Sequence, residues 1–369
     1  MTAKEHDTPT LSWCEQLPKV ELHAHIHGSI RTTTLQEILL EDAQLHGTAP
    51  RSLPPNRSLD ECFEMFHLIH QVVVSRAVLR RITIEAVEDF AKANVKYLEL
   101  RSTPRALERD GASRADYVAE VVSALEECHA REDLDIEVRL LLSINRNQPL
   151  EIAKETVNMA LEWKQKSPYI VGIDLSGHSE RPNSEFHLFE NTLDDARAGG
   201  LKLALHFAEH FDDDESDRIL TFRPDRLGHA CCLPDNLYQR MISLRIPIEM
   251  CLTSNVHTLA RYRSECPCAS KDSSGLCICG YKAHPHARVL MGELGETPTG
   301  CYPLCICTDD QGVLDTTLPR EYMRTVEAFD LSKTRLRELA RAAIPTIFDT
   351  TQQARLVAIM DRFETQNQR

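Results

Sequence analysis

Two histidines, His23 and His25, stand one residue apart in the segment 19–29 of this 369-residue chain. Apolar and polar residues alternate before them and a Gly-Ser pair follows, which predicts a β-strand that ends in a turn. Side chains alternate between the two faces of a strand, so both imidazoles project to the same side. Two neutral imidazoles on one face can bind one metal ion such as Zn²⁺. The alternative is an edge strand with solvent-exposed histidines, and the rest of the chain decides between the two.

Further ionisable side chains follow later predicted strands at the point where each strand ends. They are His206 with Glu209 three residues on, His229, and the pair Asp309 and Asp310. Singly, each could be a packed core histidine or a helix cap. Together they offer imidazoles and a carboxylate for one metal ion, and leave a Glu, a His and an Asp for proton transfer. Their shared position at strand ends favours a single site.

The elements that must position these residues alternate regularly along the chain. After the His23 strand, strands are predicted at 95–100, 136–144, 170–175, 201–206, 226–227, 246–252 and 304–307. Helices are predicted at 32–41, 59–74, 78–93, 114–131, 150–166 and 186–198. This alternation is typical of parallel βαβ units, and eight of them predict a (β/α)8 TIM-type barrel with its active site at the carboxyl ends of the strands. An open doubly wound sheet is disfavoured, because no Gly-rich loop follows the first strand.

The predicted domain organisation is an N-terminal arm followed by one domain, which contains two irregular segments. Residues 1–16 are predicted to form a polar N-terminal arm, and residues 17–369 a single barrel domain. An extra helical pair between the first two strands is expected to lie over the barrel mouth as a lid. A Cys-rich insertion at about 262–300 precedes the last strand, with thiols at Cys266, Cys268, Cys277 and Cys279. These could hold a structural zinc, but Cys-x-Cys departs from the usual Cys-x-x-Cys spacing, so a surface loop is the preferred interpretation.

Composition restricts the partners and the compartment. The formal net charge of −14 argues against non-specific binding to nucleic acid. No apolar run is long enough for a membrane span, and no signal peptide is recognisable at the N-terminus. The thirteen cysteines are therefore interpreted as reduced thiols of a cytoplasmic, cytosolic protein, expected to be a monomer. The histidines that follow no strand end are interpreted as surface or packing residues: His46, His67, His129, His178, His187, His210, His257, His284 and His286.

Four motifs make the chain similar to a known family. LHAHIHGS at 22–29, LHFAE at 205–209, RLGH at 226–229 and TDD at 308–310 resemble the adenosine and AMP deaminase family. Within it, LPKVEL at 17–22, ELRSTPR at 99–105, DLSG at 174–177 and CLTSN at 251–255 are similar to the adenosine-deaminase-like branch, the N6-methyl-AMP deaminases. The resemblance covers residues from about 17 to about 348, apart from the insertion.

The resemblance implies a zinc-dependent hydrolytic deaminase that converts N6-methyl-AMP to IMP and methylamine. One Zn²⁺ per chain would be held by His23, His25, His206 and Asp309. Glu209 would protonate purine N1, and His229 would orient the metal-bound water and assist its deprotonation. Asp310 would contact N7, the Gly177 backbone N–H would contact N3, and His25 would also border the substrate. The alternatives are an adenosine deaminase and a non-catalytic purine-binding member, the latter disfavoured because no metal ligand or proton-transfer residue is missing.

A second group of residues is expected to bind the 5′-phosphate. Ser102, Thr103, Pro104 and Arg105 follow the second strand, and His70 lies on the predicted lid. An Arg guanidinium can hydrogen-bond phosphate oxygens in pairs, although Arg105 could also be a surface charge. Two positions depart from the branch. His27 replaces an Asn or Asp, and Asn145 stands where an acidic residue is common near the ribose. An imidazole at position 27 can donate to a phosphate that a carboxylate would repel, so the monophosphate is expected to be preferred over the nucleoside.

Overall fold

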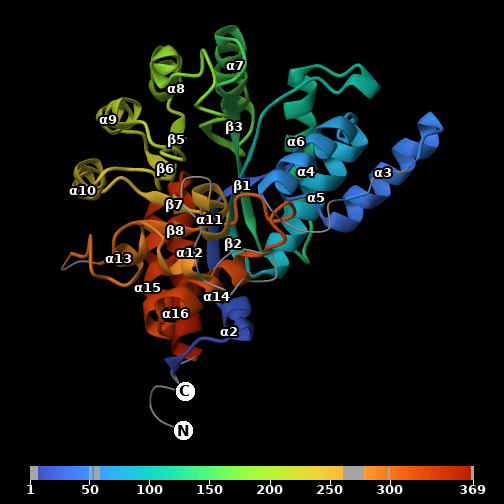
Figure 1. Ribbon diagram of the computed structural model, residues 1–369. Coiled ribbons are helices and arrows are strands. Elements are labelled where there is room, and N and C mark those ends of the chain that lie inside the picture. Colours follow the sequence, from blue (N-terminus) through green and yellow to red (C-terminus); the bar gives the residue numbers. More distant parts are fainter. Residues whose placement is uncertain (1–6, 50–51, 54–58, 261–277, 298–299, 367–369) are drawn as a thin grey trace.

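The computed structural model describes residues 7–49, 52–53, 59–260, 278–297 and 300–366. Eight parallel strands form its centre and are hydrogen-bonded to one another in chain order (Figure 1). They are β1 Lys19–His25, β2 Val95–Ser102, β3 Glu137–Asn145, β4 Ile170–Ser176, β5 Lys202–Phe207, β6 Arg226–His229, β7 Ile248–Met250 and β8 Leu304–Ile306. The prediction of a (β/α)8 barrel is confirmed.

The barrel closes at its mouth, where the first and last strands meet. The Asp309 backbone N–H donates to the His23 carbonyl over 2.8 Å, and the His25 N–H donates to the Asp309 carbonyl over 2.9 Å. Ala24 and Asp309 therefore form a parallel bridge just beyond the end of β8. The same two backbone hydrogen bonds therefore close the barrel and bring His23, His25 and Asp309 together.

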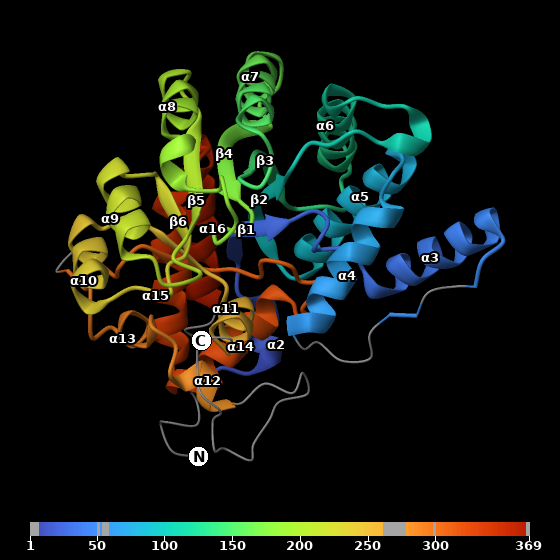
Figure 2. The same ribbon diagram turned by 45° about the horizontal axis from the view of Figure 1, so that its top comes forward.

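Helices surround the strands, as the two views in Figures 1 and 2 show. The longer ones are α3 Thr32–His46, α4 Leu59–Val72, α5 Arg76–Lys92, α6 Arg114–His129, α7 Leu150–Lys166, α8 Glu190–Ala198, α9 Asp213–Phe222, α10 Asp235–Leu244, α11 Leu252–Ala260, α14 Leu318–Phe329, α15 Lys333–Ala343 and α16 Gln353–Gln366. The strands β2 and β4 are buried along nearly their whole length, as expected for parallel strands covered on both faces. None of the helices in the described ranges combines the length and apolar composition that a membrane span requires.

The segment predicted as a polar N-terminal arm contains a packed helix, α2 Leu11–Gln16. Thr10 caps its first turn, and the Trp13 ring packs 5.8 Å from the Phe363 ring of α16. Lys19 is buried and donates to the Cys14 carbonyl over 2.6 Å, which satisfies a terminal carbonyl of the helix. Six residues are too few for a periodic pattern to indicate a helix, and tertiary packing stabilises this one.

The structure describes parts of the two irregular segments, the extra helical pair and the Cys-rich insertion. The predicted helical pair between β1 and β2 is present as α3 and α4, and residues of α4 line the pocket described below. After residue 277 the insertion contains two short helices, α12 Ile278–Lys282 and α13 Ala287–Leu290, so this part is not a surface loop. Cys266, Cys268 and Cys277 lie outside the described residues, as does the side chain of Cys279.

Candidate active site

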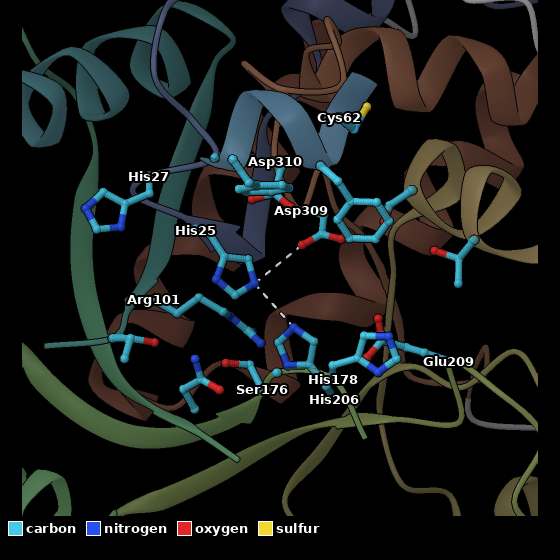
Figure 3. Close-up of a pocket in the computed structure, with 18 of the residues that line it drawn as sticks. His25, His27, Cys62, Arg101, Ser176, His178, His206, Glu209, Asp309 and Asp310 are labelled. Carbon is cyan, nitrogen blue, oxygen red and sulfur yellow. Dashed lines mark hydrogen bonds and ion pairs between the residues drawn. The ribbon is translucent and has the colours of Figure 1, made fainter. Parts of the chain in front are cut away.

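The predicted site residues converge at the carboxyl ends of β1, β5, β6 and β8. Figure 3 shows His25 between His206 and Asp309, with its Nε2 atom 3.3 Å from Nε2 of His206 and 3.4 Å from Oδ1 of Asp309. His23 Nε2 lies 3.4 Å from the same carboxylate oxygen. A fourth imidazole, that of His229, approaches this group, and ligand atoms of His23, His206, His229 and Asp309 all lie within 4.8 Å of one another.

Two buried carboxylates fix the orientation of two of these rings. The Nδ1 atom of His23 is 2.7 Å from Oε2 of Glu249, and Nδ1 of His206 is 2.9 Å from Oδ1 of Asp174. Burial by itself would raise the pKa of Glu249, but Arg101 and Arg226 hold it well below its usual range. An ionised carboxylate only accepts hydrogen bonds, so each Nδ1 carries a proton, and each Nε2 presents a lone pair to the centre when the ring is neutral, as a metal ligand must be.

These lone pairs fit a metal ion. The buried His23 Nε2 atom has no hydrogen-bond partner among the described residues, although a buried polar atom normally has one. Several imidazole nitrogens and one carboxylate form a donor set that suits Zn²⁺ and other borderline divalent cations. Histidines whose second nitrogen donates to a carboxylate are typical of such centres.

Arg101 joins the two supporting carboxylates. Its guanidinium donates to Asp174 over 3.1 Å and to Glu249 over 2.8 Å, and its side chain is 0% exposed. Arg101, Asp174 and Glu249 were not predicted as site residues. The available signal was a charged residue inside an otherwise apolar strand, because such a residue is buried only when it is paired.

The residues predicted to transfer protons lie beside this group. His229 Nε2 is 3.7 Å from Oε1 of Glu209 and 4.0 Å from Oδ2 of Asp309. Burial lowers the pKa of His229 to about 4, so the ring is neutral near pH 7. Glu209 is 34% exposed and lines the pocket.

Asp310 approaches the backbone of the turn after β1. A Cβ added to Gly28 would lie 1.6 Å from Oδ1 of Asp310, so only glycine leaves room for this carboxyl group. Burial, together with the neighbouring Asp309 carboxylate, raises the pKa of Asp310 well above its ordinary value. Oδ1 of Asp310 has no hydrogen-bond partner within the described part of the chain.

A pocket of about 670 Å³ opens over these groups, which is large enough for a nucleotide. The predicted substrate-binding residues that line it are His25, His27, His70, Ser102, Thr103, Arg105, Asn145, Gly177 and Asp310. Pro104 is buried and is not among the lining residues.

The predicted phosphate-binding residues form one wall of the pocket. Arg105 donates to the His70 carbonyl over 2.8 Å and to the Val73 carbonyl over 2.5 Å, so it also fixes the C-terminal end of α4. The His27 and His70 rings meet edge to face with centroids 5.6 Å apart. His27 Nε2 is buried and lacks a hydrogen-bond partner among the residues described, so it can bond a ligand.

The neighbouring part of the wall is formed by the ends of β3 and β4, because β3 pairs with β2. The Asn145 side-chain oxygen accepts the Asn147 backbone N–H over 2.9 Å. Gly177 has φ +98°, and a Cβ at this position would lie 2.5 Å from that oxygen. The conformation and the space both require glycine here, which leaves backbone rather than side chain facing the pocket.

A closed parallel barrel with imidazoles and carboxylates gathered at the carboxyl ends of its strands places the protein in the class of barrel hydrolases. The profile described as adenosine deaminase matches residues 18–269. The N6-mAMP deaminase of Arabidopsis thaliana is 36% identical over 94% of this chain and 98% of its own length. The N6-methyl-AMP deaminase of Homo sapiens is 33% identical over 94% of this chain and 93% of its length.

A solved structure agrees with these sequence comparisons. The crystal structure of arabidopsis ADAL complexed with IMP is 35% identical, covers 96% of this chain and 99% of that chain, and gives a TM-score of 0.82. The chain belongs to the adenosine deaminase family and is a hydrolase of the deaminase type. The family resemblance stated from the motifs is confirmed.

Proposed function

We propose that this protein is a zinc-dependent deaminase that hydrolyses N6-methyl-AMP to IMP and methylamine, with one Zn²⁺ per chain. The observation that carries the proposal is the convergence of four imidazoles and Asp309 at the floor of the pocket. Relatives with this activity in their names match nearly the whole chain, and one was solved with IMP, the proposed product.

The zinc ligands in this proposal are His23, His25, His206 and Asp309, and His229 faces the attacking water instead. When bound, the metal supplies a Lewis acid that lowers the pKa of a water molecule toward neutrality. Either His25 or His229 could complete the set by distance alone. Metal analysis of His25→Ala and His229→Ala separates the two: we expect lost zinc in the first and retained zinc in the second.

The remaining residues act on the purine. Water adds to C6, and Glu209 delivers a proton to N1 as the aromatic ring system is broken. His229 orients the attacking water, Asp310 hydrogen-bonds N7, and the Gly177 N–H contacts N3. One proton of the water replaces the proton that Glu209 gives to N1. The remaining hydroxyl proton moves to the amine nitrogen as the C6–N bond breaks, which releases methylamine and leaves the C6 carbonyl of IMP.

The 5′-phosphate distinguishes this proposal from an adenosine deaminase. In our proposal Ser102, Thr103 and Arg105 bind it, together with His27 and His70. A substrate panel on the metal-loaded protein tests this, with nucleosides compared with nucleotides and amino with methylamino groups. We expect a strong preference for N6-methyl-AMP, and equal efficiency on adenosine would refute the phosphate site.

Two substitutions sharpen this test. Arg105→Ala should raise the KM for the nucleotide far more than the KM for the nucleoside, because only the nucleotide loses a charge-assisted hydrogen bond. His27→Asp should act in the same direction through repulsion. Arg109→Ala is the matched control, because Arg109 pairs with Asp42 and does not line the pocket.

The compartment and the oligomeric state remain predictions. We propose a cytosolic monomer. The nine cysteines whose side chains are described form no disulfide with one another, which is typical of a reducing compartment.

A further inference from the structure

Two buried histidines from the insertion reach the candidate active site. His284 and His286 lie between α12 and α13, drawn in orange in Figure 1, and are 2% and 0% exposed. They follow no predicted strand end, which favours a surface or packing role, and their burial agrees with packing. The structure shows in addition that both are hydrogen-bonded to the surroundings of His229.

His286 holds the backbone of His229. Its Nε2 atom is 2.7 Å from the His229 carbonyl, and a carbonyl can only accept, so Nε2 carries the proton. Tyr238 donates its hydroxyl to the other nitrogen over 2.9 Å, and the two rings stack. His229 and Ala230 have φ values of 62° and 57°, and two successive residues in the left-handed region need such support.

His284 holds the ring of His229 through Asn255. The backbone N–H of His286 donates to Nδ1 of His284 over 3.2 Å. Because a backbone N–H can only donate, the neutral His284 ring carries its proton on Nε2. This nitrogen is 3.2 Å from Oδ1 of Asn255, and the sulfur of Cys231 is a more distant neighbour at 3.7 Å.

The direction of each hydrogen bond then determines the next. Asn255 accepts through its oxygen, so its NH₂ group donates to Nδ1 of His229 over 2.8 Å. An imidazole that accepts at Nδ1 and is neutral carries its proton on Nε2. The Nε2–H group of His229 therefore points toward Glu209 and Asp309.

We propose that Asn255, His284 and His286 form a positioning cluster that fixes the orientation and the tautomer of His229, so that Nε2–H faces the pocket as a hydrogen-bond donor. The inference rests on the proposed function, in which His229 orients the attacking water. A donor at this atom holds the water oxygen but cannot accept a proton from it, so in this proposal His229 orients the water and does not assist its deprotonation. The other tautomer would offer a lone pair suited to a metal ligand. The end of the insertion thus contributes to the active site through His229.

The tautomer can be measured directly in the wild-type holoenzyme. ¹⁵N-histidine NMR, with His229 assigned by comparison with His229→Gln, should show a protonated Nε2 and an unprotonated Nδ1. A protonated Nδ1 would overturn the proposal. This readout does not depend on the substrate, so it separates a wrong tautomer from a wrong assignment of N6-methyl-AMP.

Asn255→Asp is the matched functional test. The substitution keeps the shape but replaces the donating NH₂ with an accepting oxygen, which requires the proton of His229 to move to Nδ1. We expect kcat to fall about 10²–10⁴-fold, as with a catalytic imidazole held in the wrong tautomer, while KM stays within threefold and zinc content is unchanged. Asn158→Asp, on the exposed face of α7, is the control for the charge change.

His286 allows a test by conservative rescue. His286→Phe keeps a ring to stack on Tyr238 but removes the donor to the His229 carbonyl, and we expect kcat to fall at least tenfold. His286→Gln retains an N–H donor and should recover most of this loss. Wild-type kcat in Asn255→Asp, or equal kcat in the two His286 variants, would refute the positioning cluster.

Discussion

Replacing Arg101 with methionine should weaken metal binding without any contact between residue 101 and the metal. The guanidinium bonds Asp174 and Glu249, and these carboxylates orient His206 and His23. Without it, two buried carboxylates lose a shared cation. Losing one partner of a buried ion pair costs about 3–5 kcal/mol, and losing a group that orients metal ligands costs about 10–100-fold in metal affinity.

We therefore expect Arg101→Met to bind zinc about 10–100-fold more weakly, which corresponds to about 1.4–2.7 kcal/mol. Competition with a chromophoric chelator measures the affinity, and denaturant unfolding of the metal-free protein measures the separate loss of stability. Arg139→Met is the matched control. Arg139 is also buried and bonds Asp349 over 2.9 and 2.6 Å, but it lies near the start of β3, away from the mouth.

Comparing these two variants tests whether Arg101 positions the metal ligands. Both should lower the free energy of unfolding, because each removes a buried cation from a carboxylate. Only Arg101→Met should lower the zinc affinity. Wild-type zinc affinity in Arg101→Met, or an equal loss in Arg139→Met, would show that Arg101 does not position the histidines through their carboxylates.

Glu209→Gln should lower kcat by about 10²–10⁴-fold with zinc content unchanged, because it removes a general acid and keeps the shape; a rate within a fewfold of wild type would exclude Glu209 as the proton donor. Gly28→Ala should lower kcat/KM by at least tenfold, since the added Cβ would displace the Asp310 carboxyl group from its position 1.6 Å away, and circular dichroism should show an intact fold. A variant in which the four cysteines of the insertion are changed to serine should keep its zinc and its activity. Loss of both would mean that the insertion holds the metal. The four positions are Cys266, Cys268, Cys277 and Cys279.

The parts of the fold that sequence predicted are those with strong local patterns. The apolar runs of β2, β3 and β4 and the periodic helices α5, α6 and α7 were placed to within a few residues. In the last third the strands β7 and β8 were also predicted to within two residues, although they have only three residues each. No helix after residue 198 was predicted, and α11 begins at Leu252, only two residues after β7 ends.

The site residues also fall into those that a local pattern predicted and those that it did not. His23, His25 and His206 were predicted because each stands on or at the end of a recognisable strand. Glu249 and His284 were not, because their importance comes from contacts across the barrel. Glu249 bonds a histidine 226 positions away, and His284 bonds a residue of α11 from within the insertion. Local sequence patterns contain no information on such pairings, which only the closed barrel creates.

The backbone at the strand ends shows what holds the site together. Ala208, His229 and Asp309 all have left-handed φ values, between 50° and 63°, which cost a residue with a side chain about 1–2 kcal/mol each. In each case a distant donor holds the carbonyl. Cys232 bonds Ala208 over 2.7 Å, His286 bonds His229 over 2.7 Å, and His25 bonds Asp309 over 2.9 Å. These three residues lie at or just after the ends of β5, β6 and β8, so the strained backbone and the hydrogen bonds that compensate for it lie at the same strand ends as the candidate site residues.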